Sequence, residues 1–151
     1  MKRNIAHWIA TCGPIGEMPV APGTFGSLVA VPLIVLTTGH SILFFLTLVV
    51  LIVIGIWSSS VAVRDFGQQD PGNVVIDEVC GMMISFLLVP SVDWKVLIAG
   101  FIGFRFFDIV KPLPIRLFER FPSGYGIVLD DLAAGLYTNL ILQVLTRYAH
   151  L

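Results

Sequence analysis

Five carboxylates lie next to apolar segments of the sequence, where an uncompensated charge is costly. They are Asp77, Glu78, Asp108, Asp130 and Asp131. The two adjacent pairs each occur where a charged loop gives way to an apolar run, and acidic residues at the start of a helix often only cap it and offset its dipole. Two such pairs and a third acid in one short chain favour a shared site over capping alone.

Arg105, Asp108 and Lys111 follow one another at intervals of three residues, which places them on one stripe of a helix. The stripe could be a self-paired ladder that neutralises buried charge, or it could belong to a site with the other carboxylates. The five carboxylates and the two basic residues together carry a formal charge of −3. Such a cluster would repel itself without bound cations.

Oxygen ligands without a nearby His or Cys suit a hard cation. We therefore expect one or two Mg²⁺ ions, with Ca²⁺ or Mn²⁺ as the second choice. The predicted ligands are the five carboxylates Asp77, Glu78, Asp108, Asp130 and Asp131, of which Asp77, Glu78, Asp108 and Asp131 are also the catalytic candidates. A cation there could polarise a phosphoryl group and activate water. Arg105 and Lys111 could then contact the phosphate of a substrate.

A loop with two glycines, residues 21–27, precedes the first long apolar run. Its backbone N–H groups and the hydroxyls of Thr24 and Ser27 could hold an anion. An ordinary helix cap explains the same spacing equally well. Thr24 and Ser27 are thus candidate substrate-binding residues in addition to Arg105 and Lys111.

The rest of the chain indicates a membrane protein. Hydrophobic residues make up 56% of its 151 residues and charged residues only 13%, against roughly 25% charged in an ordinary soluble domain. Because the bilayer offers the backbone no hydrogen-bonding partners, the apolar runs predict helices. We expect a single all-α, polytopic membrane domain over residues 1–151, in which the first helix is spanning or re-entrant. The five predicted helices are Phe25–Thr38, Ile42–Val63, Val79–Pro90, Trp94–Val110 and Leu132–Ala149.

Short connections at residues 39–41 and 91–93 predict two antiparallel helical hairpins. The other connections then share the opposite face, which holds most of the Lys and Arg residues and is therefore expected to be cytoplasmic. The same face collects the carboxylates, so the polar site is expected at the cytoplasmic ends of the helices. No run of Lys or Arg suggests nucleic-acid binding, which we exclude.

Four segments resemble the hallmark motifs of the phosphatidylglycerophosphatase A family. In chain order they are Pro19-Val20-Ala21-Pro22-Gly23-Thr24-Phe25-Gly26-Ser27, Val74-Val75-Ile76-Asp77-Glu78-Val79-Cys80-Gly81, Phe104-Arg105-Phe106-Phe107-Asp108-Ile109-Val110-Lys111-Pro112-Leu113-Pro114-Ile115 and Gly126-Ile127-Val128-Leu129-Asp130-Asp131-Leu132-Ala133-Ala134-Gly135. One such motif alone would be weak support. Four in order, covering nearly the whole chain, are hard to match by chance.

The resemblance implies Mg²⁺-dependent hydrolysis of the phosphomonoester of phosphatidylglycerophosphate, giving phosphatidylglycerol and phosphate in phospholipid biosynthesis. It also implies a multi-pass protein of the bacterial cytoplasmic (inner) membrane, surrounded by membrane lipids, with its active site facing the cytoplasm. The residue pattern alone predicts a metal and an anionic lipid but not this substrate. Two alternatives are a membrane phosphoalcohol transferase, whose D-G-x-x-A-R signature is absent, and a small cation transporter, whose carboxylates would lie toward the middle of the membrane.

Overall fold

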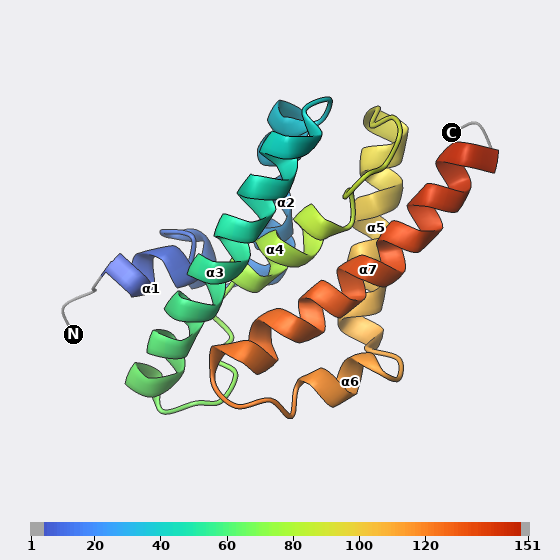
Figure 1. Cartoon of the computed structure of the whole chain (residues 1–151). Helices are drawn as coiled ribbons and strands as arrows, with labels where there is room; N and C mark the ends of the chain where they lie inside the picture. The colour runs from blue at the N-terminus through green and yellow to red at the C-terminus, as the bar shows by residue number, and fades with distance from the viewer. Residues whose placement is uncertain (1–4, 149–151) are drawn as a thin grey trace.

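The structure is a computed structural model that describes residues 5–148, and within this range the chain is helical without any strand. This confirms the predicted all-α class. The elements are α1 (Ile5–Ala10), the 3₁₀ helix η1 (Ile15–Glu17), α2 (Pro22–Thr37), α3 (Ser41–Phe66), α4 (Ile76–Ile84), α5 (Trp94–Val110), α6 (Ile115–Phe118) and α7 (Gly124–Tyr148). Figure 1 shows α2 and α3 joined at one end of the molecule, and α5 and α7 joined through α6 at the other.

The predicted set of five apolar helices is not confirmed. α5 has the predicted bounds, and α2 and α3 differ from theirs by a few residues at each end. The prediction missed α1 and α6, extended α4 beyond its end at Ile84, and started the last helix eight residues too late. That helix begins at Gly124, where a Cβ would lie 2.5 Å from the carbonyl oxygen of Ile56 in α3. Gly124 lies before the predicted helix, and because it has no side chain it allows α7 to start in direct contact with α3. The predicted last residue, Ala149, lies outside the described residues.

Two helices are long and apolar enough to cross a membrane, namely α3 and α7. At about 1.5 Å per residue their 26 and 25 residues extend over roughly 38 Å, which exceeds the roughly 30 Å hydrocarbon core of a bilayer. Only 22% of the apolar window of α3 is buried inside the protein, whereas a core helix of a soluble protein is mostly buried. A largely apolar and uncovered α3 is therefore suited to contact with lipid.

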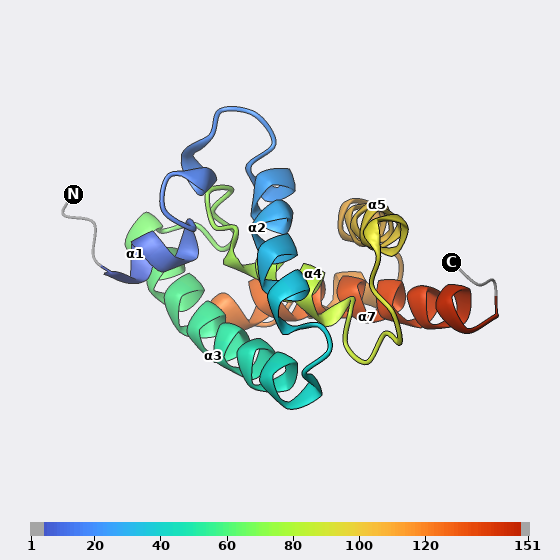
Figure 2. The ribbon, with the colours of Figure 1, turned by 90° about the horizontal axis from the view of Figure 1, so that it is seen from above.

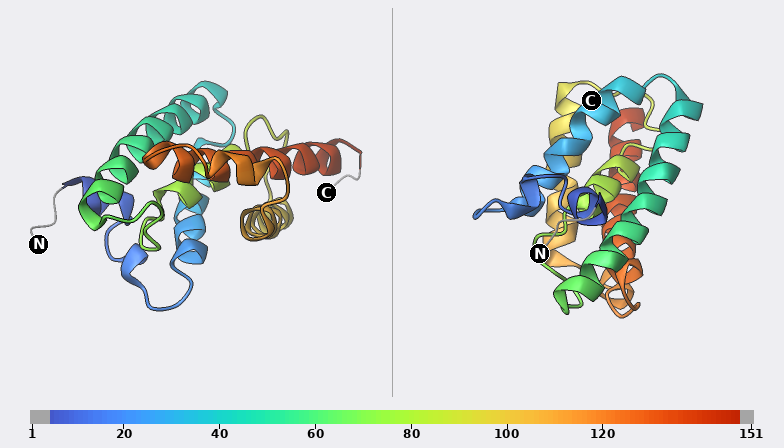
Figure 3. Two further views of the ribbon diagram at one scale, coloured as in Figure 1. Left: turned by 90° about the horizontal axis from the view of Figure 1, so that it is seen from below. Right: turned by 90° about the vertical axis from the view of Figure 1, so that its left-hand side faces the viewer.

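The short helix α4 occupies the middle of the fold. It packs against α2, α3, α5 and α7, and Figures 2 and 3 show it between α2 and α7. A Cβ added to Gly135 of α7 would lie 2.2 Å from the carbonyl oxygen of Gly81 in α4, and one added to Gly81 would lie 2.6 Å from the carbonyl oxygen of Asp131. The backbones of α4 and α7 are thus in direct contact. This contact fixes the start of α4 relative to the middle of α7.

Both ends of α4 are held by hydrogen bonds from other parts of the chain. The N–H of Val75, just before α4, donates to the carbonyl oxygen of Ala10 at 2.8 Å. After α4, the Asn139 amide of α7 donates to the carbonyl oxygens of Ser85 and Leu87 at 3.0 and 2.8 Å. Because helix ends leave backbone groups unpaired, these bonds stabilise a short helix in an apolar setting.

A charge on the exposed face of α3 tests whether this helix lies in the membrane. Val50 is 53% exposed in the middle of α3. An Asp at the centre of a membrane helix costs about 2.5–3.5 kcal/mol on insertion scales. We expect Val50→Asp to lower the membrane-inserted fraction of the protein at least several-fold, as measured by fractionation of cell membranes.

The matched control is Gln68→Asp, in the exposed loop that follows α3. This change adds the same charge outside the helix and is expected to leave insertion unchanged. Equal insertion of both variants would contradict a lipid-facing α3.

Candidate metal and phosphate site

Three carboxylates from two helices meet beside the crossing of α4 and α7. Asp77 and Glu78 are in the first turn of α4, and Asp131 is seven residues after the start of α7. Each of the three offers a carboxylate oxygen, and these oxygens all lie within 4.8 Å of one another. The side chains are deeply placed, since Asp77 is 8% exposed and Asp131 only 3%. The structure thus brings together both members of the predicted pair Asp77 and Glu78 and one member, Asp131, of the second pair.

Of these three carboxylates, only Glu78 has a basic side chain within 4 Å among the described residues, namely Arg105 at 3.9 Å. One buried oxygen on each of Asp77, Glu78 and Asp131 accepts no hydrogen bond from residues 5–148. Burial raises the pKa of Asp77 well above its usual range, and the nearby charges of Glu78 and Asp131 raise it further. Burial likewise raises the pKa of Glu78 to about 7. A group of this kind fits a hard divalent cation, because oxygen donors are its preferred ligands and its charge would remove the repulsion.

Asp108 and Arg105 form an ion pair at the edge of this group. Nη1 of Arg105 donates to Oδ2 of Asp108 at 2.6 Å and lies 3.9 Å from Oε1 of Glu78. The ion pair of Arg105 and Asp108 is part of the helical stripe that the three-residue spacing indicates. Nε of Arg105 is buried and donates no hydrogen bond within residues 5–148. Arg105 therefore keeps a free donor beside the carboxylates, which suits an incoming anion.

Lys111 does not pair with Asp108 but with two other carboxylates, Asp130 and Glu119. It follows the last residue of α5 in a left-handed conformation, with φ of 44°. Its ammonium group donates to Asp130 of α7 and, at 2.9 Å, to Glu119 after α6. Desolvation would lower the pKa of Lys111, but the two carboxylates outweigh this effect and raise it. Asp130 is thus paired with a cationic side chain and stands apart from the group of three, so its assignment as a metal ligand stays a prediction.

The predicted loop over residues 21–27 is wrong, because α2 begins at Pro22, and it is the first turn of α2 that reaches the same carboxylates. A Cβ added to Gly23 would lie 2.1 Å from Oε1 of Glu78 and 3.3 Å from Nη1 of Arg105, so a larger residue there would have to displace the Glu78 side chain. The buried Ser27 hydroxyl donates to the carbonyl oxygen of Gly23 at 2.9 Å. The N–H groups of Thr24 and Phe25 donate to the carbonyl oxygen of Ala21 at 3.0 and 3.3 Å. These donors are therefore used within the start of α2, and Thr24 and Ser27 stay predicted substrate contacts.

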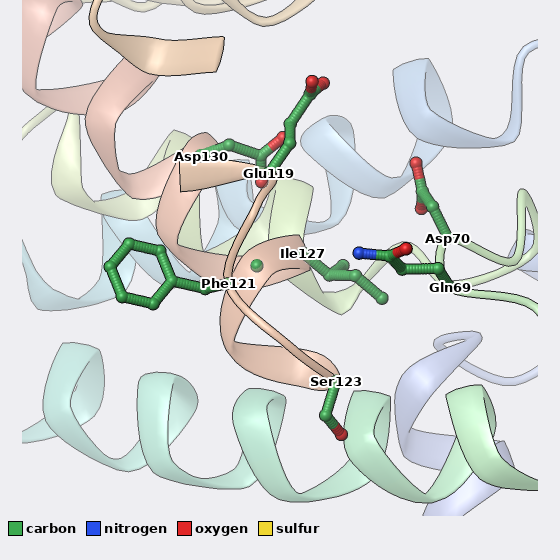
Figure 4. A pocket seen from close by; sticks show the side chains of 8 residues that line it. Gln69, Asp70, Glu119, Phe121, Ser123, Ile127 and Asp130 are labelled. Carbon is green, nitrogen blue, oxygen red and sulfur yellow. The ribbon is translucent and has the colours of Figure 1, made fainter. Parts of the chain in front are cut away.

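Two neighbouring cavities open beside these groups. The inner one, of about 180 Å³, is lined by all five predicted carboxylates, by Lys111 and by the loop between α3 and α4. The outer one, of about 320 Å³, is lined by residues of that same loop, of the segment from α6 to α7 and of α7. Asp70, Ile127 and Asp130 line both cavities, and Figure 4 shows them around the outer one. Asp70 was not among the predicted site residues, although the turn sequence Asp70-Pro71-Gly72-Asn73 marked its loop.

A family model and two similar proteins carry the same description. Residues 8–146 match the family model described as Phosphatidylglycerophosphatase A. The chain is 39% identical over 147 residues to phosphatidylglycerophosphatase A of Escherichia coli strain K12, covering 96% of this chain and 86% of the relative. It is 36% identical over 141 residues to phosphatidylglycerophosphatase A of Haemophilus influenzae, covering 91% and 86%.

A third relative has a name that points to another lipid. The chain is 41% identical over 140 residues to a protein of Bacteroides thetaiotaomicron that is provisionally named a phosphatidylinositol-3-phosphatase, covering 85% of this chain and 86% of the relative. No solved structure matches.

Removing one charge from the group of three tests whether it binds a cation. A ligand that binds only the folded state raises the melting temperature. We expect millimolar Mg²⁺ or Mn²⁺ to raise the Tm of the detergent-purified protein, and Asp131→Asn to lose at least half of this rise because a ligand charge is gone without a change in size.

The control is Glu119→Gln, which removes a carboxylate outside the group of three. It is expected to keep the rise in Tm. A full rise in Asp131→Asn would contradict cation binding at this group.

Proposed function

The chain belongs to the phosphatidylglycerophosphatase A family, and on this premise we propose that it hydrolyses the terminal phosphomonoester of phosphatidylglycerophosphate in bacterial phospholipid biosynthesis. The products are phosphatidylglycerol and inorganic phosphate, and the enzyme is a lipid phosphatase. The observation that carries the proposal is the group formed by Asp77, Glu78 and Asp131, with the free donor of Arg105 beside it. This arrangement combines ligands for a cation with a contact for a phosphate.

We assign the cation as Mg²⁺, held by Asp77, Glu78 and Asp131. When bound, it supplies charge that polarises the phosphoryl oxygens and lowers the pKa of water. The group of three supports one ion directly. Asp108 and Asp130 already pair with Arg105 and Lys111, so a second ion would have to compete with those basic side chains.

The side chains of the site bind the phosphate and handle protons. Asp108 orients the Arg105 guanidinium through their 2.6 Å contact, which holds Nη1 3.9 Å from Oε1 of Glu78 and leaves the buried Nε without a partner among residues 5–148. Hydrolysis breaks the bond between phosphorus and the glycerol oxygen, and water supplies a hydroxyl group to phosphorus and a proton to that oxygen. A carboxylate oxygen of the group that has no hydrogen bond is placed to accept a proton from water.

The proposed location is the bacterial inner membrane, with several crossings and the site on the cytoplasmic side. Arg64 in the last turn of α3, Lys111 after α5 and Arg116 in α6 belong to the end of the molecule at which α3 and α5 finish. Figure 1 shows that end opposite the start of α5, which carries Lys95. The excess of basic residues at one end supports a cytoplasmic orientation of that end.

The alternatives explain the structure less well. The transferase signature is absent from the sequence. A transporter needs polar groups along a path across the membrane, whereas the site carboxylates gather in one cavity of about 180 Å³. The relative named after phosphatidylinositol 3-phosphate makes that lipid a second candidate substrate.

Phosphate release by the purified protein tests this function. We expect release from phosphatidylglycerophosphate with Mg²⁺, none with a chelator, and less from phosphatidic acid or phosphatidylinositol 3-phosphate. Arg105→Ala at saturating Mg²⁺ is expected to lower kcat/KM for phosphatidylglycerophosphate by roughly 10- to 100-fold, the range for loss of a hydrogen bond to a charged group.

The control is Arg116→Ala on the exposed side of α6, which removes the same charge away from the cavities. It is expected to keep normal turnover. Absence of release by a folded wild-type protein would contradict the proposed function, and normal turnover of Arg105→Ala would contradict the phosphate contact alone.

A further inference from the structure

Asp130 has a carboxylate oxygen that neither the fold nor the cation group uses. The residue is only 4% exposed. Its Oδ2 accepts the ammonium group of Lys111, while its Oδ1 is buried and accepts no hydrogen bond from residues 5–148. Buried carboxylate oxygens normally accept hydrogen bonds. Oδ1 is therefore available to accept a hydrogen bond from a bound molecule.

The position of Asp130 indicates which molecule that is. Asp77, Glu78 and Asp131 line only the inner cavity, whereas Asp130 lines both cavities and marks their junction. Figure 4 shows Asp130 next to Glu119 on one side of the outer cavity. A substrate whose phosphate lies at the group of three and whose next atoms extend into the outer cavity must pass Asp130.

The chemistry of the outer cavity favours hydroxyl groups. Its polar lining consists of carboxylates and the neutral side chains of Gln69 and Ser123, without a Lys or Arg among its residues. These side chains offer oxygen acceptors that match hydroxyl donors. A second divalent cation is disfavoured there, because the Lys111 ammonium already pairs with both Asp130 and Glu119. The lining therefore suits the hydroxyl-bearing part of a substrate, and the phosphodiester of the lipid has to lie beyond it.

We propose that Oδ1 of Asp130 accepts a hydrogen bond from the substrate hydroxyl on the carbon next to the one that carries the scissile phosphate. This inference rests on the proposed phosphatase function. Phosphatidylglycerophosphate has this hydroxyl in its terminal glycerol, and an inositol phosphate has equivalent hydroxyls. Phosphatidic acid has an ester oxygen at that position and lacks the donor. Asp130 is thus a specificity-determining residue that selects lipids whose phosphate is on a polyol.

Lys111 is the positioning residue in this arrangement. Its ammonium group holds Oδ2 of Asp130 and so directs Oδ1 to the junction of the two cavities. Glu119 shares the same ammonium group but lines only the outer cavity. A change at Glu119 therefore shows what the loss of a contact to Lys111 does by itself, and it serves as the control for changes at Asp130.

The test compares two lipids that differ by one hydroxyl. The first is phosphatidylglycerophosphate, and the second has 1,3-propanediol in place of its terminal glycerol. We expect wild-type kcat/KM for phosphate release to be roughly 10- to 100-fold higher for the first lipid, as for other hydrogen bonds to a charged group. Asp130→Ala should bring this ratio close to one without changing the Mg²⁺ concentration for half-maximal activity, whereas Glu119→Gln should keep the wild-type ratio.

The wild-type comparison needs no variant to fold, and Asp130→Asn, which is close to Asp in size, is expected to lower the ratio as well. Equal wild-type kcat/KM for the two lipids would overturn the inference and leave the phosphatase function standing. Release from neither lipid would instead reject the proposed function, and the inference with it. An equal loss of activity of Asp130→Ala on both lipids, with a raised Mg²⁺ requirement, would identify Asp130 as a cation ligand and overturn the inference.

Discussion

The backbone contact between α4 and α7 determines where the charged residues of this protein lie. Gly81 and Gly135 let the two helices approach until an added Cβ would overlap the opposite backbone. The first turn of α4 therefore faces the segment of α7 that carries Asp130 and Asp131. Packing density in the interior leaves little freedom to change this arrangement. The position of the site thus follows from helix packing and does not require any special feature of the carboxylates themselves.

Close packing of these helices concentrates negative charge, and the remaining elements differ in how far they compensate it. Arg105 pairs with Asp108 inside α5, and Lys111 pairs with Asp130 across to α7. Asp77, Glu78 and Asp131 have oxygens without a hydrogen bond from residues 5–148, and burial without compensation is costly for a carboxylate. The structure therefore separates the five carboxylates into two that pair with basic side chains and three that suit a cation.

The parts of the fold that local chemistry decides agree with the expectations from the sequence. α5 has the predicted bounds because Asp93 caps it through the N–H of Val96 and Lys111-Pro112 ends its apolar run. The gathering of the five carboxylates at one cavity was also expected, although Asp130 and Asp131 lie about two turns inside α7 and not at a helix start. The early start of α7 could not be predicted, since it depends on the contact of Gly124 with α3. Nor could the pair of Lys111 and Asp130, because it joins residues 19 positions apart through a left-handed turn.

A structure with a visible ion shows directly whether Asp77, Glu78 and Asp131 hold a divalent cation. Mn²⁺ has ligand preferences close to those of Mg²⁺ and gives an anomalous signal in crystals of the protein. We expect an anomalous peak between the three carboxylates, with oxygen distances of about 2.0–2.3 Å. A peak elsewhere, or no peak at millimolar Mn²⁺ with the three carboxylates hydrogen-bonded to one another, would contradict this expectation.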